Sequence, residues 1–171
     1  EYMAEHGQEF DAIHASPPCQ YYSRLRYLPW NRDKVYWRSI PPTREVLLKG
    51  GKPFIIENVW DAHWDMRTPT YLCGTSLGME MLYRHRCFEA WPFSVLSPSH
   101  QKHIKVLTPG RASLGKRHHG LNGWNGVVQS QTGAQRHRSI MGIDWMTGKE
   151  LSQAIPPVYT EFIGKHLLAA L

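Results

Sequence analysis

The sequence has few cysteines, no long apolar run and no signal peptide. Its three cysteines are an odd number, and one stands in a turn-like Pro-Pro-Cys-Gln segment, so they do not indicate a disulfide framework. No apolar run approaches the roughly 18 residues that a membrane-spanning helix needs. We therefore expect a cytoplasmic protein of a reducing compartment, with no membrane partner.

Apolar residues and positive charge are well represented. A chain of 171 residues with 42% apolar residues can bury one core, which predicts one domain rather than two. Twenty Lys and Arg residues against fourteen Asp and Glu residues give a net charge of +6. This charge favours a polyanionic partner such as nucleic acid, but many basic proteins bind none, so charge alone leaves the partner open.

Two short apolar runs are each followed by a chemically functional residue. The first run, residues 12–15, precedes two prolines and Cys19, and the second, residues 53–56, precedes Glu57. Such runs are typical of strands buried on both faces of a parallel sheet. Because ligands of open α/β sheets bind beyond the carboxyl ends of the strands, we expect Cys19 and Glu57 to face one crevice. The prolines stiffen the turn that holds Cys19.

The elements between and after these runs predict an α/β fold. Residues 42–49 indicate a helix with Thr43 near its start and glycines after its end, which gives a strand-helix-strand crossover. Residues 71–74 and 87–90 are shorter strand candidates. Near the end of the chain, residues 158–168 have helical apolar periodicity, and we expect Val158, Phe162 and Ile163 on the inner face.

Several motifs occur in a defined order along the chain. Cys19 belongs to a Pro-Cys-Gln-x-x-Ser pattern, Glu57 opens Glu-Asn-Val, and residues 84–88 read Arg-x-Arg-x-aromatic. Residues 138–143 and 153–164 add two further segments. In this order the motifs resemble those of the DNA cytosine C5-methyltransferases, and the resemblance runs from residue 10 to about residue 168.

The resemblance implies roles for these residues. Carbon C5 of cytosine is a poor nucleophile, so a thiol, Cys19, first adds to C6, and a proton donor, Glu57, is needed at N3. Arg86 contacts O2, and S-adenosylmethionine donates the methyl group. Nearby cations, Arg84, Arg86 or Arg24, are expected to raise the thiolate fraction of Cys19. The supporting residues are Pro18, Gln20, Ser23, Asn58 (which orders the Cys19 loop), Val59 and Arg84, and the cofactor-binding residues are Pro17, Gln153, Ala154 and Ile155.

Structural alternatives stand beside these roles. A lone cysteine is usually a small buried hydrophobe, which is what we expect of Cys73 and Cys87. Glu57 can instead cap a helix or pair with an arginine. The histidines of His100-x-x-His103 and the pair at 118–119 have no cysteine pair at zinc-finger spacing, so the sequence predicts no metal site.

Two regions are candidates for contact with double-stranded DNA, whose target base must be flipped from the stack. Residues 21–30 are rich in aromatic and basic residues, and by the resemblance this loop closes over DNA. Residues 91–135 are loop-rich, which indicates either a solvated loop or a minimal target-recognition region. Gln129, Gln131 or Arg136 can fill the gap left by the flipped base. The predicted DNA contacts are Arg24, Arg26, Lys102, Lys105, Arg111, Lys116, Arg117, Arg136 and Arg138.

The chain departs from the family mainly at its front. The glycine-rich cofactor-binding strands of the family have no counterpart before residue 10, and Leu82 replaces a glutamine. We therefore expect a partial Rossmann-like methyltransferase fold, divided into a catalytic core (1–90), a recognition region (91–135) and a closing core segment (136–171). The missing front is expected in a preceding segment or a second subunit.

The expected function is a DNA cytosine C5-methyltransferase of bacterial or phage type, of the kind found in restriction-modification. Two alternatives remain open: a catalytically idle DNA-binding partner of a split methyltransferase, and an RNA cytosine methyltransferase. The motifs alone do not separate them.

Overall fold

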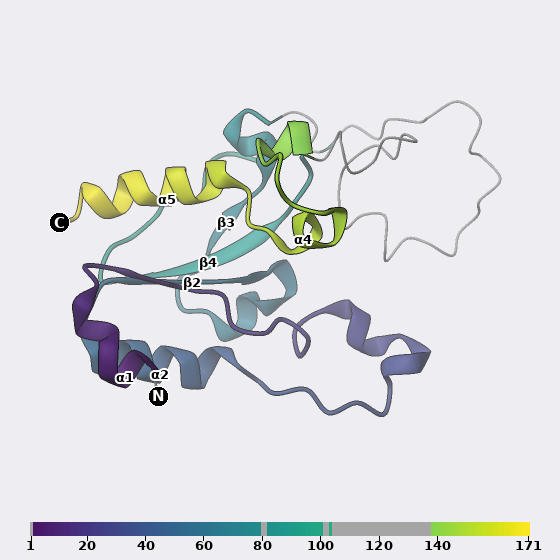
Figure 1. Cartoon of the computed structure of the whole chain (residues 1–171), viewed down its shortest axis with the longest axis horizontal. Helices are drawn as coiled ribbons and strands as arrows, with labels where there is room; N and C mark the ends of the chain where they lie inside the picture. The colour runs from purple at the N-terminus through teal and green to yellow at the C-terminus, as the bar shows by residue number, and fades with distance from the viewer. Residues whose placement is uncertain (1, 80–81, 101–102, 104–137) are drawn as a thin grey trace. The chain divides into compact units, whose positions relative to one another are not determined.

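A computed structural model describes residues 2–79, 82–100, 103 and 138–171 (Figure 1). The chain divides into two compact units. Unit 1 comprises Glu1–Tyr71, His85–Ser97 and Lys165–Leu171, and unit 2 comprises Leu72–Arg84 and Pro98–Gly164. Composition predicted one core, whereas each unit has a buried apolar cluster of its own. In the described part of the chain, no helix has the length and apolarity needed to cross a membrane.

The sheet has four strands in the order β1-β2-β4-β3, namely β1 (Ile13–Ala15), β2 (Phe54–Val59), β4 (Arg86–Trp91) and β3 (Thr70–Leu72). The parallel pairing of β1 with β2 confirms that part of the prediction. β4, however, runs antiparallel to β2, so the sheet is mixed rather than parallel. The predicted α/β class is correct, because this mixed sheet is combined with several helices.

The two predicted buried strands differ in exposure. β2 is buried along nearly its whole length, as predicted for a central strand. In β1, Ile13 and Ala15 are half-buried and His14 is exposed, so the expectation of burial on both faces was wrong there. Among the described strands β1 pairs only with β2, which explains the difference because an edge strand has a neighbour on one side.

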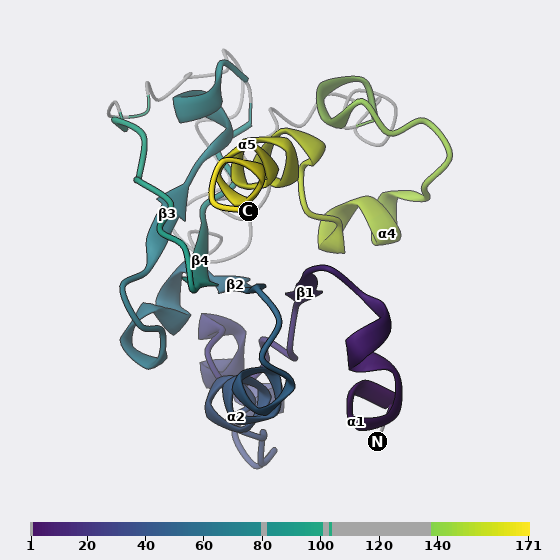
Figure 2. The same ribbon diagram turned by 90° about the vertical axis from the view of Figure 1, so that its left-hand side faces the viewer.

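Helices α1 (Tyr2–His6) and α2 (Ile40–Gly50) lie together on one face of β1 and β2 (Figures 1 and 2). α2 begins two residues before the predicted start, because prolines are tolerated in the first turn, where a helical N–H has no partner. The Thr43 hydroxyl donates to the carbonyl of Ser39 at 2.8 Å. The residue after the helix, Gly51, caps its end, and its φ of 67° is the left-handed conformation that glycine adopts readily.

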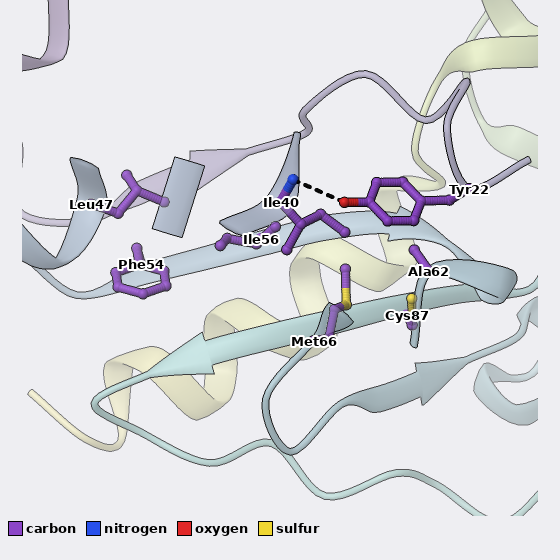
Figure 3. Close-up of a cluster of buried hydrophobic side chains, with 8 residues drawn as sticks. All are labelled: Tyr22, Ile40, Leu47, Phe54, Ile56, Ala62, Met66 and Cys87. Carbon is purple, nitrogen blue, oxygen red and sulfur yellow. Dashed lines mark hydrogen bonds between the residues drawn. The ribbon is translucent and has the colours of Figure 1, made fainter. Parts of the chain in front are cut away.

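The core of unit 1 lies between α2 and the sheet (Figure 3). Ile40 and Leu47 of α2 pack with Phe54 and Ile56 of β2, and Cys87 is fully buried beside them. Tyr22, Ala62 and Met66 belong to the same cluster. Cys87 is a small core residue of this cluster, as predicted, and Cys73 is also buried.

A buried ion pair joins α2 to β4. The Arg44 guanidinium donates from Nε and Nη2 to the two carboxylate oxygens of Glu89, each at 2.6 Å, and both side chains are less than a tenth exposed. The backbone N–H of Arg67 donates to the same carboxylate at 2.8 Å. Arg44 also donates to the carbonyl of Asp65. The pair thus has the additional hydrogen bonds that a buried charge needs.

Unit 2 is built around a second apolar cluster of Leu82, Met141, Ile143 and Leu151. Residues 138–141 are helical. Helix α4 (Gly148–Gln153) begins with a capping box between Thr147 and Glu150. Helix α5 (Pro157–Leu168) confirms the predicted closing helix.

The inner face of α5 differs from the prediction. Tyr159 and Ile163 are buried, whereas Val158 and Phe162 are half-buried. The predicted inner face did not include Tyr159, whose side chain ends in a polar hydroxyl. In the structure that hydroxyl donates a hydrogen bond to the carbonyl of Arg84. This hydrogen bond makes the burial of a tyrosine favourable.

Replacement of Arg44 by methionine should leave the Glu89 carboxylate in the core without its ion-pair partner. We expect the free energy of unfolding, measured by urea denaturation, to fall by about 3–5 kcal/mol. The double variant Arg44→Met with Glu89→Leu should recover most of this loss, because no buried charge is left unpaired. An Arg24→Ala control, which breaks an exposed ion pair with Asp61, should lose about 0–1 kcal/mol. A loss in Arg44→Met no larger than in this control would contradict the assigned role.

Candidate functional site

An ion pair at the end of the sheet joins two residues that the motifs singled out. Arg86 Nε lies 2.8 Å from Glu57 Oε1, and the side chains are only 12% and 9% exposed. The register pairs Val59 with Arg86, so Arg86 stands diagonally across from Glu57 on the same face of the sheet. The first residue of an antiparallel strand thus meets the last residues of β2.

The position of Glu57 corrects one expectation. The sequence placed Glu57 after the end of its strand, whereas β2 continues through Val59 and includes Glu57. The alternative that Glu57 pairs with an arginine is confirmed, but its partner is the arginine of the Arg-x-Arg pattern.

The segment around Cys19 is fixed to β2 and to the start of α2. Asn58 Nδ2 donates to the carbonyl of Pro17 at 2.9 Å, and the Ser39 hydroxyl donates to the carbonyl of Pro18 at 2.8 Å. After Cys19 the chain turns, because the N–H groups of Tyr22 and Ser23 both donate to the Cys19 carbonyl. Asn58, which the resemblance assigns to ordering this loop, therefore contacts it directly.

Cys19 is half-buried, and both members of the ion pair affect the pKa of its thiol. Burial raises the pKa of its thiol, the Arg86 cation lowers that pKa, and the Glu57 carboxylate raises it. The net direction of the change in pKa is upward. The expectation that nearby cations favour the thiolate therefore holds for the effect of Arg86, but burial outweighs it.

The other two cations proposed to act on Cys19 have different partners. Arg24 donates twice to the carboxylate of Asp61, at 2.9 Å in each case. Arg84 belongs to unit 2, where Nη1 and Nη2 donate to the carbonyls of Leu151 and Ser152 at 3.0 and 2.7 Å. Arg84 thus holds the end of α4 in place.

The remaining supporting and cofactor residues have ordinary structural surroundings. The Ser23 hydroxyl is buried and accepts from the N–H of Leu25 at 3.3 Å, which caps the turn that follows. Pro18 and Gln20 are exposed, while Pro17 and Val59 are half-buried. In unit 2, Gln153 ends α4, and Ala154 and Ile155 follow it, both half-buried.

The aromatic and basic segment forms a pocket within unit 1. The Arg26 guanidinium lies over the rings of Tyr21 and Tyr27, at 5.0 and 4.7 Å from the centroids. A pocket of about 490 Å³ is lined by Tyr21, Arg26, Tyr27, Arg32, Lys34, Val35 and Tyr36. Arg32 and Lys34 were not among the predicted DNA contacts, although the alternation of basic and aromatic residues continues to Tyr36.

Most of the predicted recognition region lies outside the described residues. This applies to the predicted DNA contacts Lys102, Lys105, Arg111, Lys116, Arg117 and Arg136, and to the proposed gap-filling residues Gln129 and Gln131. Arg138 is described and half-buried, and its Nε donates to the carbonyl of Met146 at 2.8 Å. Arg138 therefore has an intramolecular role.

No family model, curated protein or solved structure matches this chain. The chemistry of the site is therefore argued from its own residues.

The opposite effects of Arg86 and Glu57 on Cys19 can be measured. Only the thiolate is alkylated, so the rate of Cys19 carbamidomethylation as a function of pH, followed by mass spectrometry, gives the pKa of the thiol. Arg86→Leu removes the cation that lowers the pKa, so the profile should move to higher pH. Glu57→Gln removes the anion that raises the pKa, so the profile should move to lower pH. A profile displaced by about one pH unit corresponds to a roughly tenfold change in the rate at neutral pH.

An Arg24→Leu variant is the control, because Arg24 is paired with Asp61, and its profile should match that of the parent. Displacement of the Arg86→Leu and Glu57→Gln profiles in the same direction would contradict the arrangement described above.

Proposed function

We propose that the chain carries the catalytic residues of a DNA cytosine C5-methyltransferase. The observation that supports this most directly is that one thiol, Cys19, lies within electrostatic reach of the buried pair of Glu57 and Arg86. A nucleophile, a proton donor and a hydrogen-bonding cation are what addition to a pyrimidine ring requires. The two alternatives, an idle partner and an RNA enzyme, become outcomes of the test below.

The proposed reaction begins at C6 of a flipped cytosine. The Cys19 thiol gives its proton to solvent, the thiolate sulfur forms a bond to C6, and the electrons of the C5–C6 double bond shift through C4 toward N3. Glu57, after taking up a proton from solvent, donates it to N3 and thereby neutralises the charge that develops there. Arg86 donates to O2. Burial around these groups strengthens both interactions, because water is excluded.

Bound S-adenosylmethionine supplies the methyl group that C5 receives. Loss of the C5 proton to a base and return of the N3 proton to Glu57 then allow the sulfur–C6 bond to break, which restores the aromatic ring and releases the Cys19 thiolate. Asn58 acts as a positioning residue in this scheme, because it holds the segment that carries the nucleophile.

We also propose that part of the cofactor site is supplied by a further segment or by a second subunit. β1 is half-exposed and pairs with a neighbour on only one side among the described strands. The backbone groups on its other side can pair with another strand. Additional strands at this edge would lie next to Pro17 and Cys19, which follow β1.

The DNA contact is assigned to the pocket around Arg26. Tyrosine rings can stack on bases, and Arg32 and Lys34 can neutralise phosphates. Arg32 and Lys34 are exposed at this pocket.

Cys19→Ser should abolish the covalent complex that duplex DNA containing 5-fluorocytosine forms in the presence of S-adenosylmethionine, since fluorine at C5 prevents the elimination step. Glu57→Gln should slow methyl transfer to unmodified duplex by roughly 10²–10⁴, the range expected for a lost general acid. The complex is resolved by denaturing electrophoresis, and transfer is followed with labelled S-adenosylmethionine and nucleoside mass analysis.

The matched control is Glu45→Gln, which changes an exposed carboxylate on α2 and should leave both readouts unchanged. An undiminished complex in Cys19→Ser would overturn the assignment of the nucleophile. Methylation of single-stranded RNA in preference to DNA would favour the RNA enzyme. DNA binding without transfer, even when a segment that completes the cofactor site is added, would favour the idle partner.

Arg32→Ala combined with Lys34→Ala should weaken duplex binding and reduce its salt dependence. Each lost phosphate contact is expected to reduce the slope of log K against log salt by about 0.9. Fluorescence anisotropy at several salt concentrations measures this slope. A control that replaces Lys49, exposed near the end of α2, should leave the slope unchanged, and an equal effect of both changes would contradict a specific contact.

A further inference from the structure

Three side chains of the types that bind metal ions converge within unit 2. Cys73 Sγ lies 3.4 Å from His103 Nε2, and His103 Nε2 lies 2.8 Å from His100 Nε2. The donor atoms of these three residues all lie within 4.8 Å of one another. The sequence predicted no metal site, because it has no cysteine pair at finger spacing, whereas Cys73 stands 30 positions before His103.

The cysteine is held by a rigid turn. Cys73 is buried and immediately precedes the 3-10 helix Gly74–Leu77, and Ser76 both accepts from its N–H and donates to its carbonyl. Gly74 is required by packing, since a Cβ there would stand 2.4 Å from the carbonyl oxygen of Leu82. The position of the sulfur is therefore determined by the backbone.

The histidine end is also supported by neighbouring side chains. The ring of Tyr83 packs against His103 with centroids 4.2 Å apart. The Thr75 hydroxyl lies 3.3 Å from Cys73 Sγ and 3.5 Å from His103 Nε2. A hydroxyl in this position can donate to a thiolate, which is the kind of outer contact that supports metal ligands.

We propose that Cys73, His100 and His103 bind a zinc ion. In a tetrahedral zinc site, bond lengths of about 2.0 Å to nitrogen and 2.3 Å to sulfur place two nitrogens about 3.3 Å apart and nitrogen and sulfur about 3.5 Å apart. The observed separations of 2.8 and 3.4 Å differ from these by half an ångström or less. Small side-chain rotations therefore admit the ion.

The donor set selects the metal. One thiolate with two imidazoles suits zinc, whereas magnesium and calcium prefer oxygen ligands. Binding of Zn²⁺ adds two positive charges and releases the Cys73 proton, so the net charge of the site becomes more positive by one. A water molecule or another side chain completes the tetrahedron.

The role of the ion is structural. Cys73 is 1% exposed, so the sulfur supports the fold and is not available to a solvent-borne substrate. The ion would join the turn of residues 73–77 to His100 and His103, and so tie two residues of the predicted recognition region to a rigid turn. This role does not depend on the proposed methyltransferase reaction.

The test uses the complete 171-residue chain. Elemental analysis of the purified protein should find a single zinc ion per chain, and competition with a chromogenic chelator gives its affinity. Cys73→Ser and His100→Ala should each weaken zinc binding by more than about 100-fold, the upper range for loss of an outer contact alone. His100 is exposed, so its variant remains informative if Cys73→Ser fails to fold. His63→Ala, an exposed histidine in unit 1, is the control and should leave the affinity unchanged.

Cobalt identifies the sulfur ligand independently. The Co²⁺-loaded protein should show a thiolate-to-cobalt charge-transfer band and the intense visible bands of tetrahedral coordination, and the charge-transfer band should disappear in Cys73→Ser while circular dichroism stays unchanged. Failure to bind zinc at micromolar concentration would overturn the proposal. So would zinc binding that survives His100→Ala but is lost when His118 and His119 are replaced, because the metal would then lie elsewhere.

Discussion

The antiparallel register between β2 and β4 fixes the Glu57–Arg86 ion pair, and the candidate site depends on that pair. Six consecutive residue pairs define the register, from Phe54 with Trp91 to Val59 with Arg86. A slip by a single residue would turn Arg86 to the opposite face of the sheet and leave Glu57 buried without this partner. The buried bond between Arg44 and Glu89 helps to prevent such a slip, because it ties β4 to α2.

The same arrangement explains why residues distant in sequence share one electrostatic environment. The carboxyl ends of the parallel strands β1 and β2 meet at one edge, and the antiparallel β4 begins there. Asn58 then links β2 to the segment before Cys19 by a hydrogen bond to Pro17. Backbone pairing thus places Glu57 and Arg86 together, and the side chains of Asn58 and Ser39 hold the Cys19 segment.

Sequence reasoning found the parts of this structure that follow from local patterns. The apolar run of β2, the proline and glycine limits of α2 and the closing helix α5 were all predictable from periodicity and backbone preferences. The direction of β4 was not, because a strand of six residues looks the same whether its neighbour is parallel or antiparallel. Nor could periodicity show that Tyr159 is buried or that Cys73 meets His103, since both depend on contacts between distant segments.

Burial and charge act against each other at Cys19, and under the proposed function that opposition becomes useful. Burial keeps the pKa of the thiol above its ordinary value, and the carboxylate of Glu57 adds to this effect. In the proposed reaction Glu57 takes up a proton and passes it to N3 of a bound base, so during that step the anion that raises the pKa of Cys19 is neutralised. Arg86 contacts Glu57 and lowers the pKa of Cys19, so one cation serves both groups. A thiol that is protonated in the free protein and ionises beside a bound base would be protected from unproductive oxidation, because oxidation requires the thiolate.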